Sequence, residues 1–156
     1  MANTNFTGSP VQCDDGFIGA VTGNVTGNVT GNIKNPSVTH TPTAINATAT
    51  ATAAQVATGY ITSTSAAATT ITMPTGTLLG TALGAVRGTI FELYVDNTAG
   101  ASTVTMAVAV NGILTDAAAT TAASFGQLTV ASGVTGQARF TLMFSSATAY
   151  TFTRTA

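Results

Sequence analysis

Charged residues are scarce in this sequence: four lysines and arginines and five aspartates and glutamates are spread over 156 residues, giving a net charge of −1. The chain lacks the basic patch that electrostatic capture needs, so we expect neither nucleic acid nor an anionic membrane surface as a partner. Cys13 is the only cysteine. This excludes an intrachain disulfide framework and any CxxC pair for metal or redox chemistry.

Long hydrophobic segments are missing as well. No run of larger apolar residues approaches the roughly 18–20 that are needed to cross a bilayer. The first residues, MANTNFTGSPVQCDDG, also lack a basic stretch followed by an apolar one, which a secretory signal would have. We therefore expect synthesis in the cytosol without a leader.

Groups that could catalyse a reaction are few, because one histidine and five carboxylates would have to supply every acid, base or metal ligand. His40 has no carboxylate within twenty residues in sequence, which favours a hydrogen-bonded or exposed histidine over a general base. Cys13, Asp14 and Asp15 are adjacent, and neighbours on an extended chain point to opposite sides. This favours a solvated acidic patch over a metal site.

Glu92 and Asp96 lie four residues apart on one face of an expected strand, about 13 Å, which is wider than the carboxylate pairs of glycosidases. We expect Arg139 or Arg154 to neutralise Glu92 across the sheet or across a subunit boundary. The glycines of LLGTALGAVRG lack the lysine and the spacing of a phosphate-binding loop. The sequence thus predicts no catalytic, cofactor-binding or metal-binding residues, and a protein that is not an enzyme.

Threonine and alanine dominate what is present. There are 34 threonines, and leucine, isoleucine, valine and phenylalanine together also number 34, close to the level below which a packed core becomes doubtful. The low net charge argues against simple disorder, which usually combines few apolar residues with strong self-repulsion. A chain of this kind gains stability by pairing its surface with other chains, so the composition favours assembly.

One internal repeat stands out, VTGNVTGNVTGNIKNP over residues 21–36. Its period of four is even, so in an extended chain every fourth side chain projects to the same side. These partner-contact candidates are Val21, Val25, Val29 and Ile33. Such a ribbon can pack against another surface or wrap around identical copies; a flexible spacer is the alternative.

Larger apolar residues concentrate in the second part of the chain. No leucine precedes Leu78, and 29 of the 41 Val, Ile, Leu, Met, Phe and Tyr residues lie from Tyr60 onward. We therefore expect an extended N-terminal arm over residues 1–54 and a β domain over residues 55–156. Within the arm, Ser37–Ala54 reads as an extended connector or an edge strand, because Pro42 argues against a central strand.

The clearest strand is Gly88–Asn97, GTIFELYVDN, in which apolar and polar residues alternate. Turn residues Asp96–Gly100 follow, and then a second strand, Thr103–Val110. The Asn111-Gly112 dipeptide after it is a hairpin signal. Together these features predict an antiparallel meander as the organising unit.

Further strands complete the expected domain. They are Gln55–Thr62, Ala68–Met73, Gln127–Val130, Ala138–Phe144 and Ala147–Arg154, the last two forming a closing hairpin. Leu78–Val86 reads as a short helical turn or a loop, and Asp116–Ser124 as a short helix or a loop. The expected fold is all-β, an antiparallel β-sandwich or open barrel with an extended N-terminal arm. The expected core residues are Phe91, Leu93, Val95, Val104, Met106, Val108, Phe140, Leu142, Phe144 and Phe152.

The stretch LLGTALGAVRGTIFELYVDNTAGASTVTMAV, together with the final AYTFTR, resembles a β-rich domain of bacteriophage virion structural proteins. The VTGN run is similar to extended repeats of phage fibres. The short chain with one repeat block looks more like a capsid decoration (cement) protein than a long fibre. That resemblance implies a homotrimer seated on the major capsid protein of the virion surface, with no cofactor.

Three functions therefore remain open at this point. The first is a decoration protein that stabilises the capsid shell, and the second is a fibre or tail component with a trimeric stem and a host-binding tip. The third is a small hydrolase or lyase, which the scarcity of reactive side chains disfavours.

Overall fold

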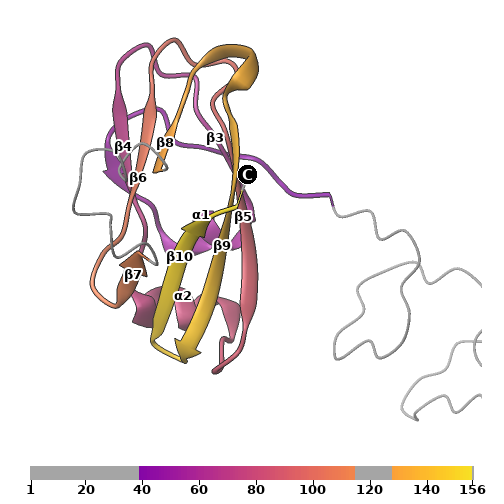
Figure 1. The fold of residues 1–156 in the computed structure, drawn as a ribbon, viewed down its shortest axis with the longest axis vertical. Helices are drawn as coiled ribbons and strands as arrows, with labels where there is room; N and C mark the ends of the chain where they lie inside the picture. The colour runs from indigo at the N-terminus through magenta and orange to yellow at the C-terminus, as the bar shows by residue number, and fades with distance from the viewer. Residues whose placement is uncertain (1–38, 115–127, 156) are drawn as a thin grey trace, which may run out of the picture. The chain divides into compact units, whose positions relative to one another are not determined.

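Strands make up most of the regular structure in the part of the chain that the computed structural model describes, residues 39–114 and 128–155. The strands are β1 (Thr43–Ala44), β2 (Ala49–Thr50), β3 (Tyr60–Thr62), β4 (Thr69–Thr72), β5 (Ile90–Asp96), β6 (Val104–Ala107), β7 (Gly112–Leu114), β8 (Thr129–Val130), β9 (Gln137–Ser146) and β10 (Ala149–Arg154). The α-helices in these ranges are α1 (Ala53–Ala57) and α2 (Gly76–Leu83). The fold is therefore β-rich, with the short helix α2 in its lower part and α1 above it, near mid-height (Figure 1).

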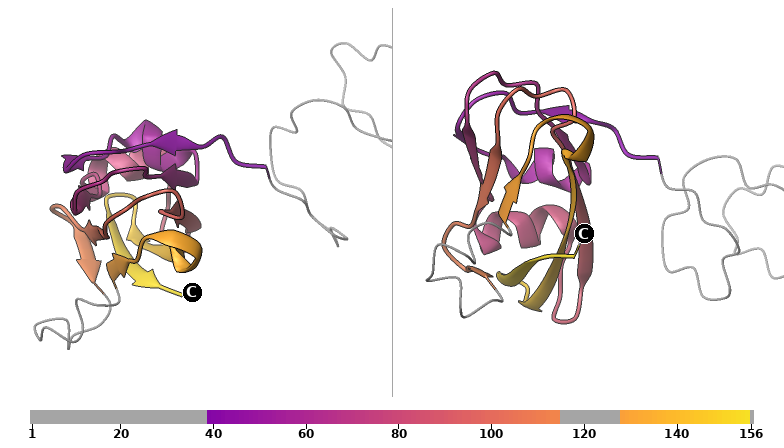
Figure 2. Two further views of the ribbon diagram at one scale, coloured as in Figure 1. Left: turned by 90° about the horizontal axis from the view of Figure 1, so that it is seen from above. Right: turned by 45° about the horizontal axis from the view of Figure 1, so that its top comes forward.

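The strands form two sheets. The larger has the order β1-β3-β5-β9-β10-β7 and the smaller has the order β2-β4-β6-β8. From β1 to β8, successive strands along the chain alternate between the two sheets. Figures 1 and 2 show the chain passing back and forth between them in this way.

This alternation determines how the strands pair. From β1 to β6 the chain crosses to the other sheet after every strand, so each of the strands β3 to β6 lies beside the one two places earlier and runs in the same direction. The pairs β1–β3, β3–β5, β2–β4 and β4–β6 are accordingly parallel. β8 instead pairs antiparallel with β6, and β7 pairs with β10. The expected antiparallel meander is wrong, because β5 and β6 belong to different sheets.

The residues that predicted hairpin turns, at Asn97 and at Asn111-Gly112, do not close hairpins in the structure. Asn97 does not close a hairpin; it starts the connection from the larger sheet to the smaller one. Asn111 has a positive φ of 64°, but the chain then enters β7, which pairs in parallel with β10. The expected hairpin at Asn111-Gly112 is therefore wrong.

The C-terminal prediction is confirmed. β9 and β10 pair antiparallel, with Phe140 opposite Arg154 and Leu142 opposite Phe152. β9 also pairs antiparallel with β5. The expected strands at Ala68–Met73 and Gly88–Asn97 are found as β4 and β5, and the described end of Gln127–Val130 as β8.

Gln55–Thr62 was expected to be a single strand, and its first half is helical instead. Thr52 caps α1: its hydroxyl accepts a hydrogen bond from the Gln55 amide, and the Gln55 side chain accepts one from the Thr52 amide. This capping box satisfies donors that the helix leaves open. Gly59, with a φ of 77°, then turns the chain into β3.

One hydrophobic cluster joins the two sheets and the helices. Of the expected core residues, Leu93, Val95, Val104, Met106, Phe140, Leu142, Phe144 and Phe152 are buried. Phe91 and Val108 are partly buried and pack against the cluster. The Phe140 and Phe152 rings stack with centroids 4.8 Å apart.

The compact unit begins earlier than the composition suggested. It runs from Val38, because β1 and β2 contribute edge strands to both sheets and Ile45 and Ala51 are buried. Of the two interpretations of residues 37–54, an extended connector or an edge strand, the edge strand is correct for β1 and β2. The expected arm contacts Val21, Val25, Val29 and Ile33 and the expected helix at residues 116–124 lie outside the described residues.

Candidate binding face

The outward side of the larger sheet carries the most chemically varied surface among the described residues. Along β5, Leu93 and Val95 point into the core, whereas Glu92, Tyr94 and Asp96 point outward. Strand register places Tyr60 of β3 and Arg139 of β9 on either side of Tyr94. One row across the sheet therefore reads tyrosine, tyrosine, arginine.

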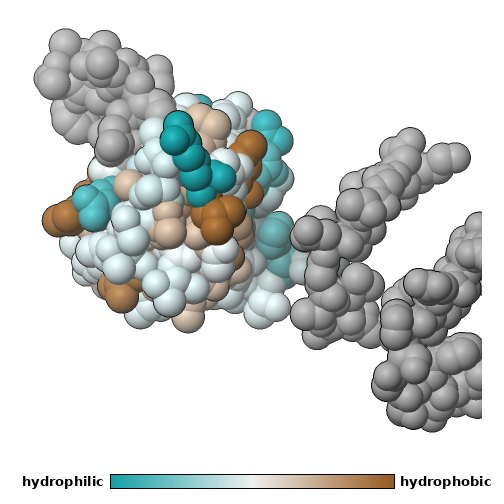
Figure 3. All heavy atoms as spheres, turned by 90° about the horizontal axis from the view of Figure 1, so that it is seen from below, coloured by the Kyte–Doolittle hydropathy of each residue, from teal (hydrophilic) through white to brown (hydrophobic). Residues whose placement is uncertain are grey.

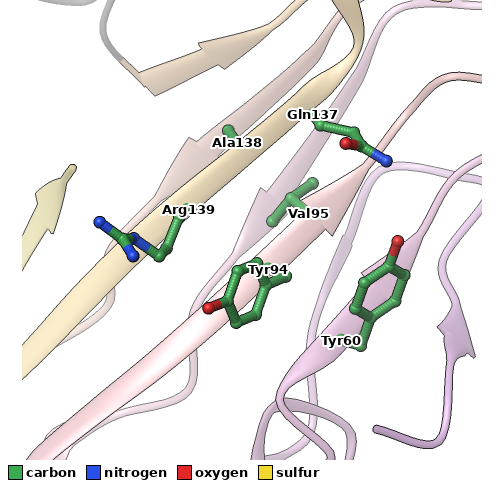
Figure 4. A pocket seen from close by; sticks show the side chains of 6 residues that line it. All are labelled: Tyr60, Tyr94, Val95, Gln137, Ala138 and Arg139. Carbon is green, nitrogen blue, oxygen red and sulfur yellow. The ribbon is translucent and has the colours of Figure 1, made fainter. Parts of the chain in front are cut away.

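Three aromatic rings meet on this face. The Tyr60 and Tyr94 centroids are 6.3 Å apart with an interplanar angle of 21°. The His40 ring lies 6.4 Å from Tyr60 and 5.6 Å from Tyr94. Figure 4 shows the two phenol rings side by side on neighbouring strands, with their faces turned towards the viewer. We call His40, Tyr60 and Tyr94 the ring cluster.

His40 fits beside the tyrosines because residue 59, between α1 and β3, is a glycine. Its Nδ1 lies 3.0 Å from the Thr58 carbonyl oxygen, and since a carbonyl only accepts, Nδ1 carries the proton. A β-carbon on Gly59 would overlap the His40 ring. The sequence favoured a hydrogen-bonded or exposed histidine, and the structure shows the hydrogen bond.

Acidic and basic side chains surround the rings. The Tyr60 hydroxyl donates to Asp96 Oδ2 at 2.9 Å, and the Tyr94 hydroxyl donates to Glu92 Oε2 at 3.1 Å. Arg139 lies 3.9 Å from Glu92 in an exposed ion pair. The prediction that an arginine neutralises Glu92 across the sheet is confirmed for Arg139; Arg154 instead donates to the Thr129 carbonyl.

These contacts set the protonation of two groups. Hydrogen bonds from Thr98, helped by Tyr60 and Gln137, hold the pKa of Asp96 below its usual value despite some burial. Partial burial and the neighbouring Asp96 raise the pKa of Tyr60. Asp96 is thus a stable anion and Tyr60 a stable neutral phenol at physiological pH.

Two shallow depressions adjoin at Tyr60. One, of about 320 Å³, is lined by Tyr60, Tyr94, Val95, Gln137, Ala138 and Arg139. The residues that line it belong to β3, β5 and β9 (Figure 4). The other, of about 440 Å³, is lined by Thr39, His40, Pro42, Tyr60, Thr62 and Asp96.

A second group of exposed side chains lies on the same sheet face, at the opposite end of β5. Ile90 and Met143 are directly paired across β5 and β9, and they are 65% and 47% exposed. Val86 is also exposed. It begins a turn that is closed by hydrogen bonds between Val86 and Thr89, and the Thr89 carbonyl accepts a hydrogen bond from the Phe144 amide. Val86, Ile90 and Met143 are named the apolar end here. Viewed from below, this end shows several separate hydrophobic side chains on a mostly neutral surface (Figure 3).

No group of three or more histidine, cysteine, aspartate or glutamate side chains in residues 39–114 and 128–155 is placed to hold a metal ion. No helix in those ranges is long and apolar enough to span a membrane. Cys13, Asp14 and Asp15 lie outside them.

Sequence reasoning missed the ring cluster. The alternation of apolar and polar residues in β5 predicts that Tyr94 points outward. For the strand that contains Tyr60, the sequence predicts no neighbouring strand. The two tyrosines become neighbours only through the parallel β3–β5 pair. The signal that could have found them is the shared Tyr-x-polar spacing, Tyr60-Ile61-Thr62 against Tyr94-Val95-Asp96.

Comparison with known proteins gives no relative. No protein-family model, no curated protein and no solved structure matches this chain.

Proposed function

We propose that this chain is a structural virion protein, a capsid decoration protein that binds the outer surface of the major capsid shell and stabilises it. The observation that supports this best is the apolar end. Ile90 and Met143 are exposed and directly paired, and Val86 is exposed at the turn before β5. Apolar side chains that face solvent in this way suit contact with another protein. The resemblance of residues 78–108 to virion proteins points the same way.

The mechanism is adhesion through surfaces. A partner that binds only the assembled shell stabilises it by mass action. In a homotrimer, three copies of the apolar end and three N-terminal arms act together, so individually weak contacts add through effective concentration. The two sheets with their shared core form an open β-sandwich that carries these surfaces as a rigid unit.

A fibre or tail component is the second candidate, and the VTGN repeat favours it. In that arrangement the row Val21, Val25, Val29 and Ile33 lies in an intertwined trimeric stem. Copy number in purified particles separates the two functions. A decoration protein is present in hundreds of copies, whereas a fibre is present in a few to tens.

Binding of the purified chain to capsid shells that lack it tests the proposal. Replacing Ile90 and Met143 together by serine should weaken binding strongly and reduce the heat resistance that the protein gives to the shells. Val134→Ser is the matched control, because Val134 is 99% exposed but lies in a separate turn at Gly133–Thr135. Equal binding by the double variant and the control would contradict the role of the apolar end.

A further inference from the structure

We propose that the ring cluster and the polar side chains around it form a binding site for an uncharged pyranose residue of a glycan. The site lies near the far end of β5 from the apolar end. From Ile90 to Tyr94 the strand advances four residues, about 13 Å. The inference does not rest on the decoration function, because it concerns the free protein and a separate part of the same sheet face.

The rings provide the apolar part of the site. Tyr60 and Tyr94 lie side by side with nearly parallel planes (Figure 4), and both are partly exposed. Each pyranose has a face of C–H groups that packs on such a ring, in the way that aromatic side chains combine a large apolar surface with a polar tip. Two rings 6.3 Å apart make a platform wider than one sugar ring.

The polar groups supply the complementary edge. Gln137 and Arg139 offer N–H donors in the lining of the depression of about 320 Å³, and the exposed Glu92 beside Arg139 offers carboxylate oxygens. His40 contributes a further acceptor at Nε2, since its Nδ1 proton is engaged by Thr58. A sugar hydroxyl both donates and accepts hydrogen bonds, so a site with donors and acceptors around an apolar ring surface suits it.

Charge argues for a neutral ligand over an anionic one. Arg139 faces Glu92 at 3.9 Å, and Asp96 adds a second negative charge to the same face. A phosphate, sulfate or acidic sugar would therefore meet more negative than positive charge. A bare cation is disfavoured too, because Asp96 already accepts hydrogen bonds from Tyr60 and from the Thr98 amide and hydroxyl.

The site is held in place before a ligand arrives. The Tyr60 and Tyr94 hydroxyls are tied to carboxylates, and His40 is tied to the backbone. Side chains that are already ordered lose little conformational entropy on binding. The shallow, open form of the depression fits recognition of a chain end or a surface-exposed sugar.

Titration of the full-length protein with neutral hexasaccharides tests the inference. Maltohexaose, cellohexaose and xylohexaose serve as probes, with oligogalacturonate as the acidic counterpart and decaproline as the peptide competitor. We expect millimolar or tighter binding of at least one neutral sugar and none of the acidic one. Tyr94→Ala should weaken that binding roughly tenfold, as the loss of one stacking contact implies.

Two further variants locate the site. Tyr94→Phe keeps the ring and loses one exposed hydrogen bond, so it should bind within about twofold of the parent. Ile90→Ser, at the apolar end, should bind unchanged, and thermal unfolding checks that each variant is folded. The inference is overturned if no neutral sugar binds, if only decaproline binds, or if Tyr94→Ala binds the sugar as tightly as the parent does. Loss of capsid binding by the apolar-end variants has no bearing on these outcomes.

Discussion

Asn97 is the residue at which the chain leaves the larger sheet, and its side chain fixes the path that follows. Its Nδ2 donates to the carbonyl oxygens of Ser102, Val130 and Ala131 at 2.8, 3.2 and 3.0 Å. The residue is fully buried. One amide group thus joins the connection between β5 and β6 to the end of β8.

Replacing Asn97 by alanine should lower the free energy of unfolding by roughly 2–4 kcal/mol, because buried carbonyl groups lose their donor. Chemical denaturation measures this change. Asn46→Ala is the control, since Asn46 makes an exposed hydrogen bond to the Thr64 amide and its loss should cost about 1 kcal/mol or less. Similar losses in the two variants would contradict the role of Asn97.

The buried hydroxyl of Tyr150 should make the protein lose stability in alkali. Its side chain is fully buried, and its hydroxyl donates to the Pro74 carbonyl at 2.9 Å. Burial raises its pKa from 10.0 to about 12. Because the folded-state pKa is the higher one, the contribution of Tyr150 is complete below pH 10 and falls as the pH rises towards 12. The expected loss approaches roughly 3 kcal/mol, measured as urea unfolding against pH.

Tyr150→Phe separates this effect from general alkaline unfolding. The variant should be less stable at neutral pH by roughly 1–3 kcal/mol, because the Pro74 carbonyl loses its donor. Its stability should then fall less steeply above pH 10. Some slope remains, since the pKa of Tyr60 is also raised. An unchanged alkaline slope would contradict the assignment to Tyr150.

At the scale of elements, α2 packs on the β9–β10 turn through its glycines. A β-carbon at Gly76 would overlap the Thr148 carbonyl, and one at Gly80 would overlap the Ala147 carbonyl. The two positions are four residues apart and share one helix face. Gly76 and Gly80 therefore form the contact surface between the helix and the hairpin.

Gly80→Ala tests this contact. In an exposed helix the change would stabilise by roughly 1 kcal/mol through helix propensity. Here overpacking should reverse the sign and destabilise the protein by roughly 1–3 kcal/mol. Thr81→Ala, on the exposed side of α2, is the control and should be neutral or slightly stabilising. A more stable Gly80→Ala variant, measured by thermal unfolding, would show that the turn is not packed tightly on α2.

The elements that the sequence predicts well are those with strong local alternation. β5 and the β9–β10 hairpin follow from side chains that alternate over six or more residues. The α1 helix is missed because its five residues, AAQVA, show no helical period and only the Thr52-Gln55 cap marks it. Pairing is missed because neighbouring strands with a short turn suggest a hairpin, whereas here they enter different sheets.

The candidate site was predictable only in part, for the same reason. The face shared by Glu92, Tyr94 and Asp96 and the pairing of Glu92 with Arg139 follow from strand periodicity and charge. The positions of Tyr60 and His40 do not, because they depend on long-range parallel pairing and on the space at Gly59. Local patterns carry no information about either.

For the molecule as a whole, the arm and the β unit are expected to have separable roles. β1, the first strand among the described residues, begins at Thr43, and the compact unit begins at Val38. Deleting residues 1–37 should therefore leave the unfolding midpoint nearly unchanged. Binding to capsid shells should fall sharply, because each copy loses one of the contacts that act together.

A full-length variant with Val21, Val25, Val29 and Ile33 all changed to serine distinguishes the apolar row from the mere presence of the arm. If the row makes the contact, this variant should bind shells as poorly as the deletion while keeping the same length and charge. If it binds as the parent does, the arm acts only as a tether. Full binding by the deletion itself would leave the apolar end as the sole attachment, and a lowered unfolding midpoint would show that the arm belongs to the folded unit.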